Sequence, residues 1–135
     1  MPAFWLQVRV YLEDTDAQGV VYNASYFRFM ERARTEWFGE RGVDHRVLDE
    51  TLGLAVVLTS IEAKFLAPGR LGDMLAVSAE LEELKGARAV FAQQIRQGAR
   101  DGPLVVSARS VCACIERGSG KACRWPAEFV EGLSL

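Results

Sequence analysis

The most constraining feature of this sequence is a single change in hydrophobic period near its start. Residues 4–12 alternate apolar and polar side chains, a period of two that predicts a half-buried β-strand. Further along, apolar positions recur at steps of three and four, which places them on one face of a helix. A helix that is apolar over so much of its circumference is expected to be enclosed rather than laid on a surface. The helical positions are Tyr26, Met30, Ala33 and Trp37, with Phe27, Phe29 and Phe38 broadening the face.

The first strand is expected to bury one face and to stop at the acidic, turn-prone residues 13–19. Asn23 is a good N-cap for the helix that follows, because its side-chain oxygen can accept a backbone N–H of the first turn. Gly39 and Gly42 are expected to end that helix. The buried face of the strand is predicted to be Phe4, Leu6, Val8, Val10 and Leu12.

From residue 54 onward the period of two returns. Four more strands are expected at roughly 54–66, 73–84, 87–97 and 103–116, and their short links imply antiparallel pairing. Asp44 is expected to cap a short second helix before them. One long apolar helix and one antiparallel sheet have to bury each other, which predicts an α+β domain with a curved sheet wrapped around the helix. Such a sheet leaves edges open, so edge pairing with a second copy predicts a homodimer.

Composition narrows the possible functions. The 135 residues suit one compact domain over positions 1–135, and a net charge of −2 offers no basic surplus for nucleic acid. No apolar stretch reaches about 18 residues, so no integral membrane segment is expected. Residues 1–5 lack the basic and apolar regions of a signal peptide. Three cysteines are an odd number without metal-ligand spacing, which favours a reducing cytoplasm over a disulfide framework or a metal site.

Few side chains outside one segment suit catalysis. His45 is the only histidine, and in its polar surroundings it is expected to be an exposed surface residue. Cys112 and Cys114 lie two apart on a strand and therefore share a face. We favour buried small hydrophobes for this pair, with a redox or ligand pair as the alternative. Gly69 and Gly72 lie between strands rather than ahead of a helix, so they form no phosphate-binding loop.

The segment 13–26 combines carboxylates with the start of a buried helix. Glu13, Asp14 and Asp16 follow the first strand, and Gly19 lets the backbone approach closely. The unpaired N–H groups and the dipole of a helix N-terminus favour developing negative charge. A carboxylate folded back beside that terminus would supply the base or nucleophile, and the helix the oxyanion hole, that acyl transfer needs. The alternative interpretation is a solvated acidic loop followed by a helix cap.

Three stretches carry a family pattern: RVYLEDTDAQGVVYNASY at 9–26, FMERARTEW at 29–37 and KFLAPGRLGD at 64–73, with a further match from Gly120 to Pro126. They resemble the hotdog-fold acyl-CoA thioesterases. The closest branches are the 4-hydroxybenzoyl-CoA thioesterase family and the thioesterase associated with the Tol–Pal system. The resemblance covers nearly the whole chain. It implies a curved antiparallel sheet of about five strands around one central helix, a dimer or dimer of dimers joined through edge strands, and an acyl-CoA substrate without a separate cofactor.

The same resemblance assigns roles to individual residues. It makes Asp16, three residues before Gly19, the catalytic carboxylate, and it puts the oxyanion site at backbone N–H groups near Asn23. Gly19 shapes the loop, and Asp14 and Glu13 are structural or solvated. Many members of the Tol–Pal branch have a histidine where this chain has Asn23. Asparagine cannot act as a general base near neutral pH, so Asp16 has to carry the chemistry nearly alone.

Further residues are expected to contact the substrate. Coenzyme A carries phosphates, which basic side chains would bind, and the acyl group needs an apolar slot, although its lining residues are equally suited to the core. The candidates are Lys64, Arg70 and Arg88 for the phosphates, and Tyr22, Tyr26 and Phe29 for the acyl group.

Two routes fit the chemistry: Asp16 attacks the thioester carbonyl, or it deprotonates a water that does so. The active site is expected at a dimer interface, because family members complete their acyl pocket with residues of the partner chain. The competing hypotheses are a thioesterase for an aryl-CoA, such as hydroxybenzoyl- or hydroxynaphthoyl-CoA, and a non-catalytic hotdog protein that binds acyl-CoA.

Overall fold

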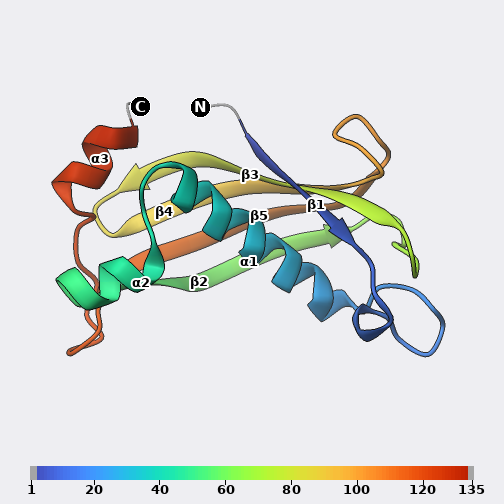
Figure 1. Cartoon of the computed structure of the whole chain (residues 1–135), viewed down its shortest axis with the longest axis horizontal. Coiled ribbons are helices and arrows are strands. Elements are labelled where there is room, and N and C mark those ends of the chain that lie inside the picture. Colours follow the sequence, from blue (N-terminus) through green and yellow to red (C-terminus); the bar gives the residue numbers. More distant parts are fainter. Residues whose placement is uncertain (1–2, 134–135) are drawn as a thin grey trace.

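The computed structural model describes residues 3–133 (Figure 1). Five strands form one antiparallel sheet in the order β1-β3-β4-β5-β2, and the long helix α1 lies across one face of it. This arrangement confirms the predicted α+β class. The elements are β1 (Phe4–Arg9), α1 (Asn23–Glu40), α2 (His45–Val47), β2 (Leu54–Phe65), β3 (Met74–Lys85), β4 (Arg88–Gln97), β5 (Leu104–Glu116) and α3 (Ala127–Leu133), with a 3₁₀ turn at Leu12–Asp14 and a π-helical turn at Leu48–Leu52.

The apolar face of α1 is enclosed, as its sequence predicts. Tyr26, Met30, Ala33 and Trp37 are each no more than 2% exposed. Burying a large apolar side chain stabilises the folded state by about 1.5–3 kcal/mol. The helix therefore owes its position to the sheet beneath it rather than to its own helical propensity.

An aromatic cluster covers the C-terminal end of α1. The ring of Phe38 lies 5.5 Å from Phe91 of β4 and 5.7 Å from Trp125, centroid to centroid, and Phe129 of α3 lies 5.8 Å away. Trp37 meets Phe91 edge to face at 5.0 Å. The segment after β5 thus closes the core at this end of the molecule.

A polar hub ties α1 to the middle of the sheet. Gln93 of β4 is 1% exposed and donates from Nε2 to the carbonyls of Met30 and Ser78, at 3.0 and 3.1 Å. Its Oε1 accepts from Ser110 Oγ at 2.7 Å and from Nη1 of the buried Arg34 at 3.0 Å. All four hydrogen-bonding positions of one amide are used, so Gln93 links α1, β3 and β5 at fixed spacing.

Two local expectations are wrong. Leu12 is 75% exposed, because β1 ends at Arg9 and the 3₁₀ turn directs this side chain away from the sheet. Asn23 is not the N-cap: Tyr22 holds that position, with no side-chain hydrogen bond, and Asn23 is the first residue of the helix. The end of α1 is predicted more closely, since it runs through Gly39 to Glu40 and Gly42 follows with a φ of 77°.

The sheet has two unequal edges. β1 has 6 residues, whereas β2 has 12 and pairs on one side only, with β5. Leu58 and Phe65 on β2 are 45% and 43% exposed. A long edge strand with exposed apolar side chains is the kind of edge that other chains pair with. Within residues 3–133, none of the helices has both the length and the apolar character that a membrane span requires.

The hub gives a stability prediction. Gln93→Leu should lower the free energy of unfolding by about 2–4 kcal/mol, because it leaves the guanidinium of Arg34 buried without its best acceptor. Gln94→Leu on the same strand should cost less than about 1 kcal/mol. The double variant Gln93→Leu/Arg34→Met should lose less than the sum of its single variants in urea unfolding. Strict additivity would contradict the coupling.

Candidate active site

Asp14 anchors the acidic loop to the start of α1. Its side chain is 6% exposed. Oδ2 accepts from the Tyr11 N–H at 2.8 Å, and Oδ1 lies 3.5 Å from Nη2 of Arg28. Its backbone carbonyl accepts from the Tyr22 N–H at 2.9 Å and from Ser25 Oγ at 3.1 Å. These contacts confirm the structural role expected of Asp14, because both its carboxylate and its carbonyl are used to hold the loop.

Asp16 opens a tight turn two residues later. Its N–H donates to the Val20 carbonyl at 2.9 Å, and its own carbonyl accepts from the Gly19 N–H at 3.1 Å. The side chain is exposed, and Oδ1 accepts from the Gln18 N–H at 2.8 Å. Gly19 has a φ of 79°, and a Cβ there would meet nothing within 4 Å. The glycine is therefore required for its backbone conformation rather than for space.

The N-terminus of α1 opens onto a groove. The first N–H groups of an α-helix have no acceptor within the helix, and no side chain caps this one. We call the adjoining hollow, of about 320 Å³, the N-terminal groove. It is lined by Val20, Val21, Asn23, Tyr26, Phe65, Leu66, Ala67 and Pro68.

One hydrogen-bonded contact holds Tyr26, which lines this groove, against Gly69. The Gly69 N–H donates to the hydroxyl of Tyr26 at 2.9 Å, and the Gly69 carbonyl accepts from the Val21 N–H at 2.8 Å. A Cβ on Gly69 would lie 3.1 Å from both Tyr26 Oη and Val21 Cγ2, so this position has little room for a side chain. Burial raises the pKa of Tyr26, which keeps its hydroxyl protonated at neutral pH.

Asp16 lies beside the groove but does not line it. Val20 lines the groove, and its carbonyl accepts the Asp16 N–H. Val20 is also bridged to Arg70, which brings Arg70 to the same loop. Within one chain, the residues around the start of α1 therefore include Asp16, Gly19, Asn23 and Arg70. The Asp16 carboxylate is open to solvent.

The other predicted substrate residues are spread more widely. Tyr26 lines the groove, and Tyr22 stands 60% exposed at the N-cap of α1. Phe29 is fully buried beneath Tyr26, with ring centroids 6.3 Å apart, so it belongs to the core. Lys64 lines a separate hollow on the sheet beside Arg109.

Arg88 lies at the far end of the sheet from the loop. Register places Met74, the first residue of β3, opposite Arg9, and Lys85, the last, opposite Arg88. Nε of Arg88 lies 3.8 Å from Glu83 Oε2. Within one chain the structure therefore does not bring Arg88 to the groove.

The remaining reactive side chains lie away from Asp16. His45 is half-buried, with its ring 5.7 Å from Phe38 and its Nε2 buried without a partner, so the expectation of an exposed histidine is wrong. Cys112 and Cys114 are buried, at 2% and 0% exposure, as expected. A larger hollow of about 370 Å³, between residues 41–52 and α3, has no histidine or cysteine in its lining. Across residues 3–133 we find no cluster of three His, Cys, Asp or Glu side chains that suits a metal ion.

Known proteins resemble this chain in sequence and in fold. Residues 10–133 match the family model of the thioesterase-like superfamily. The acyl-CoA thioesterase YbgC of Haemophilus influenzae is 38% identical over 125 residues, which cover 93% of this chain and 90% of that protein. The 1,4-dihydroxy-2-naphthoyl-CoA hydrolase of Thermosynechococcus vestitus is 31% identical over 106 residues, covering 78% of this chain and 73% of that protein. The crystal structure of a probable thioesterase from Bartonella henselae aligns with a TM-score of 0.86 and 32% identity, covering 93% of this chain and all of that one (100%).

The hydrogen bond between Gly69 and Tyr26 yields a prediction with a matched control. Tyr26→Phe should lower the free energy of unfolding by about 1–2 kcal/mol, because the Gly69 N–H loses its acceptor. Tyr22→Phe removes a hydroxyl from an exposed ring and should change stability by less than about 0.5 kcal/mol. Urea unfolding compares the two, and hydrogen exchange at Gly69 should accelerate in Tyr26→Phe alone. Equal losses in both variants would contradict the assignment.

Proposed function

The chain belongs to the thioesterase-like superfamily, and from that premise we propose that it hydrolyses acyl-coenzyme A thioesters with Asp16 as its catalytic carboxylate. Thioester hydrolysis is the activity named for its curated relative in Haemophilus influenzae. The observation that carries the proposal is the N-terminus of α1, which no side chain caps and which opens onto an apolar groove beside the Asp16 turn. The products are a free carboxylic acid and coenzyme A.

The N-terminus of α1 would stabilise the negative charge that develops on the thioester oxygen. Attack on a thioester carbonyl puts negative charge on its oxygen, and backbone N–H groups at Asn23 would donate to that oxygen. Loss of one good oxyanion donor costs about 3 kcal/mol, and a backbone donor survives any side-chain substitution. A thiolate leaves more readily than an amide nitrogen, so no strong general acid is needed. Hydrolysis consumes water alone, and we expect no cofactor.

Asp16 can act by two routes. As nucleophile it forms a mixed anhydride that water then cleaves, and as general base it takes a proton from the attacking water. Both routes need the ionised form of the carboxylate. Glu13 and Asp14 take no part in either route.

A second copy of the chain would complete this site. The open edge of β2 ends at Phe65, which lines the groove and is 43% exposed. Pairing along β2 would cover this ring and enclose the groove, so we propose a homodimer with the active sites at its interface, and a dimer of dimers is compatible with it. Exclusion of water there would strengthen every electrostatic contact at Asp16.

The substrate contacts follow from position. Arg70 lies at the loop and is our first candidate for the phosphates of coenzyme A, with Lys64 and Arg88 as further candidates from elsewhere in the assembly. Tyr26 lines the groove and Tyr22 precedes the groove residue Asn23, and both would contact the acyl group. Three free cysteines fit a reducing compartment, and we propose the cytoplasm.

An aryl-CoA is the second candidate substrate. The ring of Phe65 lies 5.9 Å from Tyr26 and 6.2 Å from Phe27, so one wall of the groove is aromatic. Aromatic walls favour an aromatic acyl group by offset or edge contacts. Hydrolysis rates on short-chain, long-chain and hydroxybenzoyl or hydroxynaphthoyl thioesters separate the two candidates. Binding of all of these without turnover would instead indicate a non-catalytic acyl-CoA-binding protein.

The catalytic assignment is tested by Asp16→Asn. This variant should lower kcat by about 10²- to 10⁴-fold, because amide nitrogen and oxygen cannot replace the carboxylate as base or nucleophile. Glu13→Gln, an exposed carboxylate on the same loop, should keep the rate within about twofold. Circular dichroism and size-exclusion chromatography check that both variants remain folded and assembled. A wild-type rate in folded Asp16→Asn would refute the assignment.

The two routes differ in where oxygen from water ends. After many turnovers in heavy-oxygen water, an anhydride that water cleaves at its aspartyl carbonyl leaves label in the Asp16 carboxylate, whereas water activation leaves that carboxylate unlabelled. Label in Asp16 therefore establishes the anhydride route. Peptide mass spectrometry of the recovered enzyme reads this difference directly.

A further inference from the structure

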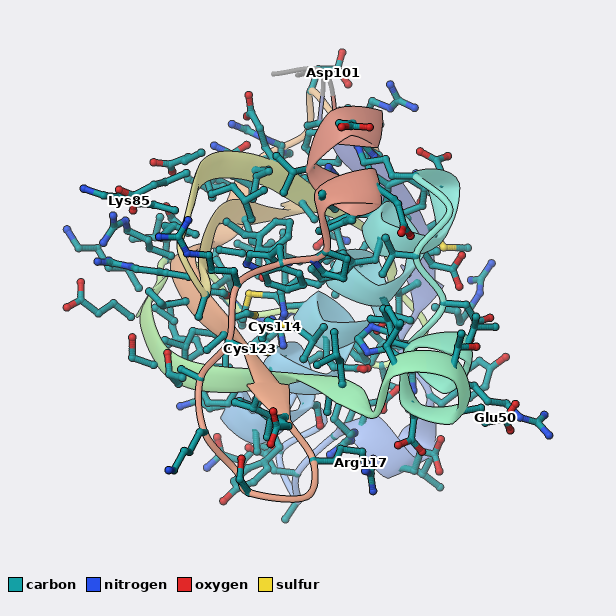
Figure 2. The ribbon with its side chains drawn as sticks, turned by 90° about the vertical axis from the view of Figure 1, so that its left-hand side faces the viewer. Glu50, Lys85, Asp101, Cys114, Arg117 and Cys123 are labelled. Atoms are coloured by element: carbon teal, nitrogen blue, oxygen red, sulfur yellow. The ribbon has the colours of Figure 1, made fainter. Side chains whose placement is uncertain are left out.

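Two thiols are in contact at the end of the molecule away from the Asp16 loop. The Sγ atoms of Cys114 on β5 and Cys123 in the following segment are 3.5 Å apart, and Figure 2 shows the two labelled residues side by side. The backbone holds them there: the Cys123 N–H donates to the Cys114 carbonyl at 2.9 Å, next to an antiparallel bridge between Ile115 and Ala122. Both cysteines are free.

This placement suits a disulfide. Residues directly opposite in antiparallel strands have Cα atoms about 4.5–5.5 Å apart, which lies within the range of about 4.4–6.8 Å found for disulfides. The turn at residues 117–120 fixes the register of the two segments. Rotation of the two side chains would bring the sulfurs from contact to bonding distance. We propose that Cys114 and Cys123 are an oxidisable pair, which a small-molecule disulfide converts to an intrachain disulfide.

The two thiols differ in access, and this sets the order of steps. Cys123 is partly exposed, whereas Cys114 is fully buried and burial raises the pKa of its thiol to about 12. Cys123, as thiolate, attacks one sulfur of the small-molecule disulfide and displaces the first small thiol. Cys114 then gives up its proton and attacks the Cys123 sulfur, displacing the second. The two cysteines lose two protons and two electrons, and the oxidant becomes two thiols.

The bond would fasten the segment that closes the core. Two residues beyond Cys123, the Trp125 N–H reaches the Gly86 carbonyl at 3.4 Å, and the Trp125 ring stacks on Phe38. A disulfide at Cys123 restricts this segment in the unfolded chain and keeps Trp125 close to β5 when the end of the molecule opens locally. The oxidised chain should therefore resist unfolding more than the reduced chain.

Cys112 supplies a matched control. It lies two residues earlier on β5, with 2% exposure, and its sulfur lies near Arg34 rather than near another cysteine. Cys112→Ala therefore removes a buried thiol of similar burial from the same strand. It should leave the oxidation of Cys114 and Cys123 unchanged.

The test starts from the full-length reduced protein and uses glutathione disulfide as oxidant. Titration of thiols in denaturant should fall from three to one, and the intact mass should drop by two hydrogen atoms. Peptide mapping should show Cys114 linked to Cys123. The melting temperature should rise by about 5–10 °C on oxidation and return with a dithiol reductant. Cys123→Ser should show no such rise, and Cys112→Ala should match the wild type.

Several results would overturn the proposal. They are three free thiols after prolonged oxidation, a linkage that includes Cys112, or a lasting mixed disulfide of glutathione at Cys123. A bond that forms without raising the melting temperature would overturn its role in fastening the C-terminal segment. Cys114→Ala serves as a second variant that removes the buried thiol of the pair. If the core does not tolerate Cys114→Ala, the partly exposed Cys123→Ser still tests the proposal.

Discussion

The enclosure of α1 by the sheet is the contact from which the rest of the structure follows. Its aromatic face supplies most of the driving force, but apolar contacts alone allow a helix to slide or rotate on a sheet. The Gln93 amide removes that freedom, because it binds a carbonyl of α1 together with groups of β3 and β5. With α1 held in one register, its N-terminus has a fixed place beside Val20 and Phe65, which line the same groove as Asn23. The candidate site is therefore a product of core packing.

The order of elements could be predicted because hydrophobic period reports directly on burial. One helical face among five alternating segments has few ways to fold, and the observed sheet is one of them. The ends of the helices and strands were harder to predict, since tertiary hydrogen bonds decide them. The Asp14 carbonyl accepts the Tyr22 N–H, and Tyr22 rather than Asn23 is the N-cap of α1. The sequence gives no sign that Gln93 is buried, because a polar residue in a strand is normally assigned to the exposed face. The Cys114–Cys123 contact depends on a turn whose register no local pattern specifies.

The two aspartates of the acidic loop have different surroundings. The Asp14 carboxylate is hydrogen-bonded within the loop and holds it to α1. The Asp16 carboxylate accepts one backbone N–H through Oδ1, and its backbone is held by its neighbours in the turn. Sequence spacing alone treats the two residues as near equivalents, and only the resemblance separates them. The places of the basic residues could not be predicted, because charge on a strand says nothing about which end of a sheet it occupies. Arg88 pairs with Glu83 at one end, whereas Arg70 joins the loop at the other.

The close approach at Gly69 bears on how this groove can be re-engineered. A Cβ at residue 69 would lie 3.1 Å from both Tyr26 Oη and Val21 Cγ2, so a larger residue there requires these groove-lining side chains to shift. Phe65 and Leu66 stand on the rim with exposed side chains. A directed library for the proposed acyl groove would best vary these two rim positions and hold residue 69 invariant.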